Sequence, residues 1–220
     1  MSSAPYTPRE EQLHRLIHGG GLVASLVAVP WLIHEAANDM HLTRLIGASI
    51  FGLSAMLVLF TSTVYHNTTD AKLRLRWRTV DHAAIYVLIA GTYTPFTIGV
   101  LGGAWGWSLF ALVWAIALLG IVAKTTIGFR YPRLSTALYL AMGWAGIVAI
   151  KPLMQALSRP TLGWILAGGA MYTLGVPFYV WKSRLYTHAV WHLLVLGGIC
   201  CHFMAVRAVL LGPGATTMAR

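Results

Sequence analysis

Acidic residues are scarce in this chain, with six Asp and Glu against sixteen Lys and Arg in 220 residues. Charged residues of both signs make up 10% of the sequence, whereas hydrophobic residues make up 57%. An average soluble domain carries about 25% charged residues, so this composition argues against an ordinary soluble fold. The net charge of +10 does not indicate a nucleic-acid partner, because basic residues of membrane proteins gather in cytoplasmic loops and orient the helices.

Cysteine and the common catalytic loops are also rare or missing. The two cysteines, Cys200 and Cys201, are adjacent within an apolar run. They cannot readily bridge each other and have no third partner, so the sequence contains no disulfide framework. It also lacks a G-x-S-x-G elbow and a phosphate-binding glycine loop.

Long apolar segments dominate what remains. Runs of about 20 apolar residues predict transmembrane helices. We expect an all-α integral membrane protein, a single seven-helix domain over residues 1–220 in which residues 1–13 form a cytoplasmic N-terminal segment. The predicted spans are 14–35, 43–66, 79–100, 104–123, 133–153, 161–181 and 187–211.

The basic residues set the predicted orientation. With the N-terminus in the cytoplasm, eleven of the sixteen Lys and Arg lie on the cytoplasmic side. The other five lie outside: Arg44, Lys151, Arg159, Arg207 and Arg220. The positive-inside rule therefore favours a cytoplasmic N-terminus and an external C-terminus, in the cell's inner or plasma membrane.

One carboxylate, Asp81, falls well inside a predicted span. The other five acidic residues are expected in tails or short loops, with Glu35 at the boundary where the first span gives way to a polar stretch. An ionisable group in a membrane segment costs about 2.5–3.5 kcal/mol at mid-helix, so it usually marks a functional interior. In the predicted topology, His66 ends the second span, Asp81 begins the third, and His188 and His192 begin the seventh. All four therefore lie near the cytoplasmic leaflet.

These residues indicate a catalytic zinc site. His188 and His192 are one helical turn apart on one face, a spacing that suits two nitrogens on one metal, and His66 would supply a third. Three imidazoles leave a fourth position for water, from which Asp81 could accept a proton. Ser62, one turn before His66, suits a supporting role or a substrate oxygen. The structural alternative is an interhelical hydrogen-bond cluster.

The remaining histidines are given other roles. His34 and Glu35 begin an H-E-x-x-H motif whose second histidine is missing, so we reject a metalloprotease site. His18 is expected to be a hydrogen-bonded packing residue that could instead line the site, and His14 is expected at the interface. His202 lies about 15 Å further along its helix than His192, too far to share the metal.

Several segments resemble the haemolysin III-like bacterial branch of the progestin and adipoQ receptor superfamily. They are STVYH (62–66), VDHAAIYVLIAGTYTPF (80–96), AGGAMYTLGVPFY (167–179), THAVWHLLVLGG (187–198), and Glu10-Glu11 with His18-Gly19. The N-terminal signature departs from the family pattern at His14, where we expect asparagine.

The resemblance implies a seven-helix bundle with zinc held by His66, His188 and His192 near the inner leaflet, and Asp81 reaching zinc through water. Relatives include receptors with lipid-amide hydrolase activity, and the fold is similar to that of alkaline ceramidases. Bacterial members are named for haemolytic activity and are linked to membrane lipid homeostasis.

The expected function is zinc-dependent hydrolysis of a membrane lipid amide or ester that enters from the inner leaflet. One alternative is a non-enzymatic sensor or receptor of membrane state with structural zinc. The other is a haemolysin or cytolysin, which we favour least because polar groups at one leaflet do not form a pathway through the membrane. The sequence does not specify the substrate, the oligomeric state, a partner protein or the physiological role.

Overall fold

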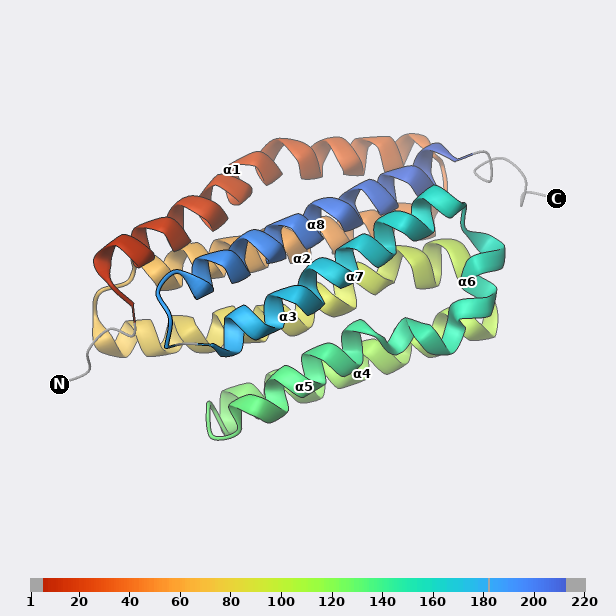
Figure 1. Ribbon diagram of the computed structural model, residues 1–220. Coiled ribbons are helices and arrows are strands. Elements are labelled where there is room, and N and C mark those ends of the chain that lie inside the picture. Colours follow the sequence, from red (N-terminus) through yellow and green to blue (C-terminus); the bar gives the residue numbers. More distant parts are fainter. Residues whose placement is uncertain (1–5, 182, 213–220) are drawn as a thin grey trace.

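The computed structural model describes residues 6–181 and 183–212, which form helices joined by short loops (Figure 1). In chain order these are α1 (Pro8–Asn38), α2 (Leu42–Asn67), α3 (Ala71–Phe96), the π-helix η1 (Thr97–Leu101), α4 (Gly103–Thr126), α5 (Pro132–Gly143), the 3-10 helix η2 (Ala145–Ala149), α6 (Ile150–Ala156), α7 (Arg159–Val180) and α8 (Thr187–Leu211).

Seven stretches of the described chain are long and apolar enough to cross a membrane, which confirms the predicted number of spans. The third combines α3 with η1, which begins two residues after Pro95, the predicted kink. The fifth is divided into α5, η2 and α6. The first and third helices begin earlier than predicted, at Pro8 and at Ala71.

The early start of α1 follows from its capping residues. The Thr7 side chain accepts a hydrogen bond from the Glu10 backbone N–H at 3.3 Å, and the Glu10 carboxylate accepts one from the Thr7 N–H at 2.9 Å. Pro8 occupies the first turn, where its missing N–H costs nothing. Glu10 and Glu11 therefore lie in a helix, and the prediction that they belong to a tail was wrong; Glu35 likewise lies in α1 rather than in a loop.

α1 presents polar and small residues to the protein interior. Its buried positions recur every three or four residues, as expected for one helical face: Glu10, His14, His18, Gly21, Ser25, Val29, Leu32 and Ala36. Large apolar side chains such as Leu16, Val23 and Val27 are exposed. A helix with apolar residues outside and polar residues inside suits contact with lipid on its outer face and a functional site on its inner face.

The helices pack in a chain of neighbours: α1 lies against α2 and α8, α2 against α3, and α7 against α8 (Figure 1). α2 and α3 approach each other closely at Gly47, where a Cβ atom would lie 2.6 Å from the Pro95 Cα. The first turns of α1, α3 and α8 and the last turn of α2 meet at one end of the bundle (Figure 1). The predicted convergence of the end of α2 with the starts of α3 and α8 is therefore observed, and the first turns of α1 join them.

Candidate metal centre

Four histidine rings from three helices cluster at this end of the bundle. The centroids of His14, His66, His188 and His192 all lie between 4.5 and 5.5 Å from one another. His14 is fully buried, and His66 and His192 are each 3% exposed. Such a concentration of imidazole nitrogens away from water is typical of a metal site.

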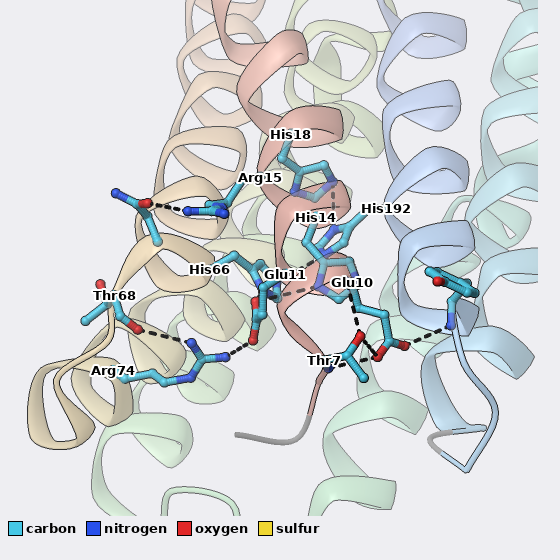
Figure 2. Close-up of polar contacts among 12 residues, drawn as sticks. Thr7, Glu10, Glu11, His14, Arg15, His18, His66, Thr68, Arg74 and His192 are labelled. Carbon is cyan, nitrogen blue, oxygen red and sulfur yellow. Dashed lines mark hydrogen bonds and ion pairs between the residues drawn. The ribbon is translucent and has the colours of Figure 1, made fainter. Parts of the chain in front are cut away.

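Two of these imidazoles face each other through the same ring atom. The His66 and His192 Nε2 atoms are 3.1 Å apart, while each Nδ1 has a different partner (Figure 2). His66 Nδ1 lies 2.6 Å from the Glu11 Oε2 atom, and His192 Nδ1 lies 2.9 Å from His18 Nε2. A ligating histidine commonly binds the metal with one nitrogen while the other is held by a carboxylate or another acceptor.

The distance between the two Nε2 atoms fits a shared metal ion. Two nitrogens bound tetrahedrally at ~2.0–2.1 Å are separated by about 3.3 Å, close to the 3.1 Å observed. An N–H···N hydrogen bond also fits this distance, so the geometry accommodates a metal without requiring one. His18 lies at the edge of the cluster, where its Nε2 atom contacts His192, and it also lines the small cavity beside the cluster.

Glu11 joins three helices at the site, a role that we did not predict. Its carboxylate accepts hydrogen bonds from Arg74 of α3 and contacts His66 of α2, while Arg74 also donates to the Thr68 carbonyl at 3.1 Å (Figure 2). The signal was present in the sequence as the capping motif that begins at Thr7, which extends α1 far enough to include Glu11.

The remaining predicted residues border a small cavity beside the cluster. Ser62, Asp81, His188 and His192 all line it, together with His82, and its volume is about 20 Å³, enough for one water molecule. Within the described chain, the Ser62 hydroxyl and His188 Nδ1 are buried without hydrogen-bond partners. The Asp81 carboxylate lies 3.5 Å from His82 Nδ1.

The most compact set of potential ligands differs from the predicted set. One ligand nitrogen from each of His14, His66 and His192 lies within 4.8 Å of the others, so these three buried histidines could hold a metal ion. The structure therefore brings His66 and His192 together as predicted, places His188 beside them, and adds His14. His14, which we expected at the membrane interface, is fully buried in the bundle, because the first turns of α1 pack against α2 and α8.

Tyr6, two residues before α1, covers part of the cluster. The Tyr6 ring stacks on His188 at 4.8 Å and meets His14 edge-on at 4.9 Å. Burial raises the pKa of the Tyr6 phenol above its usual value, which keeps the ring neutral. The Glu10 carboxylate accepts a hydrogen bond from the Tyr186 backbone N–H at 2.9 Å, which links the first turn of α1 to the start of α8.

A larger apolar cavity adjoins the small one. Its volume is about 310 Å³, at the lower end of the range for ligand pockets, and it extends between α3, α5, α7 and α8. Its wall includes His202, which stacks on Tyr172 away from the histidine cluster. The two cavities share part of their lining: Val58, Ile85, Tyr179, Trp191 and Val195.

Comparisons with known proteins agree with this architecture. A family profile described as "Haemolysin-III related" matches residues 6–203. The "Hemolysin-3 homolog" of Bacillus subtilis (strain 168) is 42% identical over 201 residues, covering 91% of this chain and 94% of the relative. "Hemolysin-3" of Bacillus cereus is 38% identical over 198 residues, covering 90% of each chain.

A more distant relative supports membership of the wider superfamily. "Heptahelical transmembrane protein ADIPOR2" of Oryza sativa subsp. japonica is 26% identical over 185 residues, covering 73% of this chain and 80% of the relative. The sequence resemblance is thereby confirmed: the chain is a multi-pass membrane protein that belongs to the haemolysin III family of the progestin and adipoQ receptor superfamily.

Proposed function

We propose that the protein is a membrane-embedded, zinc-dependent hydrolase of a lipid amide or ester. One observation carries this proposal. A cluster of buried imidazoles with facing Nε2 atoms borders a cavity lined by Asp81 and Ser62, and that cavity adjoins a larger apolar one. Metal donors, a proton acceptor and space for an acyl chain are thus next to one another.

The proposed ligands are His66, His188 and His192, with Asp81 reaching the metal through a water molecule. Imidazole donors without nearby soft sulfur ligands favour zinc. When bound, zinc would polarise the substrate carbonyl and lower the pKa of a water molecule toward ~7. The contacts of His66 with Glu11 and of His192 with His18 hold these imidazoles in the required orientation.

Asp81 and Ser62 have separate roles in this proposal. The Asp81 carboxylate accepts a proton from the attacking water and passes it to the leaving amine or alcohol. The Ser62 hydroxyl, which has no partner within the described chain, donates a hydrogen bond to the substrate carbonyl oxygen. Both side chains line the small cavity, so one bound carbonyl group could reach each of them.

The apolar cavity supports a lipid as the substrate. An acyl chain would occupy its roughly 310 Å³ and place the carbonyl group at the shared wall near Trp191. The distribution of basic residues favours a location of this end of the bundle at the cytoplasmic leaflet. The substrate would therefore enter laterally from the inner leaflet.

The test is fatty-acid release from defined N-acyl and O-acyl lipids by purified protein in lipid nanodiscs. Asp81→Asn should lower turnover by about 100-fold or more while most of the metal is retained. Asp39→Asn is the matched control, because this carboxylate pairs with Arg44 at the opposite end of α1. Equal turnover in wild type and Asp81→Asn would rule out the mechanism.

A second candidate is a membrane-state sensor in which zinc is structural. The observation that favours it is the additional buried imidazole of His14, because structural zinc sites are closed by four protein ligands. This function predicts that chelation lowers the Tm of the protein and that no lipid in the same panel is hydrolysed.

A further inference from the structure

We propose that His14 is a fourth imidazole ligand of the metal, so that α1 closes the coordination sphere formed by α2 and α8. This inference rests on the proposed metal site, but not on hydrolysis. Three groups of observations support it: the burial of His14, the absence of hydrogen bonds to its ring within the described chain, and its distances to the other imidazoles.

His14 is surrounded by the other members of the cluster. Its ring centroid lies 4.6 Å from that of His66, 4.9 Å from that of His188 and 5.1 Å from that of His192. Figure 2 shows the His14 side chain of α1 beside those of His66 and His192. Tyr6 covers another side at 4.9 Å. The side chain is therefore enclosed by aromatic rings and has no exposed surface.

Both ring nitrogens of His14 lack hydrogen-bond partners within the described chain. A Glu11 carboxylate oxygen lies 3.8 Å from His14 Nδ1, too far for a hydrogen bond, and the same oxygen contacts His66 at 2.6 Å. A buried polar group without a partner is unfavourable. An imidazole kept only for packing would be expected to have a partner on at least one ring nitrogen, as His18 has on Nε2.

The distances to neighbouring donors indicate the missing partner. His14 offers one nitrogen within 4.8 Å of ligand nitrogens on both His66 and His192. Movements of about 1 Å would bring these atoms to the ~3.3 Å separation of tetrahedral zinc ligands. His14 is thus better placed for coordination than His188, which lies outside this compact group.

Coordination by His14 would change what the site can do. A catalytic zinc site keeps one position for water, whereas four protein ligands fill a tetrahedral sphere. With four imidazoles bound, water or substrate oxygen reaches the metal only after His14 leaves or the coordination number rises to five. α1, which carries His14, would therefore control access to the metal.

The inference is tested by cobalt substitution of the purified full-length protein, with azide as the probe of an open coordination position. Wild-type protein should show a d–d spectrum that azide does not change, and X-ray absorption of the zinc form should indicate four nitrogen neighbours. His14→Asn should bind zinc about tenfold or more weakly, and its cobalt spectrum should change on addition of azide.

His34→Asn is the matched control, because His34 lies on the exposed side of the same helix, 3.2 Å from Asn38. It should behave as wild type in both measurements. The wild-type spectra decide the question even if His14→Asn folds poorly. A wild-type cobalt spectrum that responds to azide, with unchanged zinc affinity in His14→Asn, would overturn the role of His14 and leave the proposed function intact. Wild-type protein that binds no metal would overturn both.

Discussion

The two ends of the helix bundle use charged residues in different ways. At the end where α1 meets α2, each carboxylate has an arginine: Arg44 pairs with Asp39 at 3.0 Å, and Arg207 pairs with Glu35 at 3.1 Å. At the other end, the Glu11 carboxylate contacts both Arg74 and a histidine cluster.

The two ends also differ in whether their buried polar atoms have hydrogen-bond partners. At the histidine end, several buried polar atoms have no hydrogen-bond partner within the described chain, including both nitrogens of His14, His188 Nδ1 and the Ser62 hydroxyl. Folded proteins rarely leave such groups unpaired, because the desolvation is not compensated. The ion pairs account for the charged residues at the first end, whereas the buried polar atoms without partners at the histidine end indicate a ligand.

The largest expected effect is loss of the metal from the histidine end. The double variant His188→Ala, His192→Ala should reduce zinc from about one per chain to nearly none, measured by elemental analysis after detergent purification. His202→Ala is the control, since it removes a buried imidazole from the same helix without touching the cluster. Zinc retained by the double variant would place the metal elsewhere.

Acidification should affect the two ends of the bundle differently. Zinc needs neutral imidazoles, so protons compete with the metal for each ligand nitrogen as the pH is lowered from 8 to 5. The two arginine–carboxylate pairs at the other end do not depend on the metal. Zinc occupancy should therefore fall over this range, while the Tm of the double histidine variant changes little. Equal occupancy at both pH values would argue against histidine ligation.

The smallest expected effect compares one glutamate from each end. Glu11→Gln should weaken zinc binding about 10–100-fold, because Glu11 orients His66. Glu35→Gln should leave zinc affinity unchanged and cost about 0.2–1 kcal/mol of stability, since the pair with Arg207 is partly exposed. Titration with a zinc chelator measures the first effect and thermal unfolding the second. Similar zinc affinities in the two variants would show that Glu11 only packs.

Hydropathy was sufficient to predict the seven spans, because the membrane requires about 20 apolar residues in each crossing. It missed the first turns of α1, which are polar and begin at a cap rather than at an apolar run. The stretch from Glu10 to Ser25 nevertheless repeats polar or small residues at helical spacing. That pattern could have placed His14 in the interior.

The sequence by itself determined the number of helices, the kinds of chemical groups available and the end of the bundle at which most of them gather. These follow from local rules of hydropathy, helical periodicity and the alternation of successive spans. Only the tertiary structure decided which imidazoles face one another, that Glu11 holds His66, and that His14 lies among them. Those relations depend on the rotation and depth of α1 against α2 and α8, which are set by packing between segments far apart in the chain.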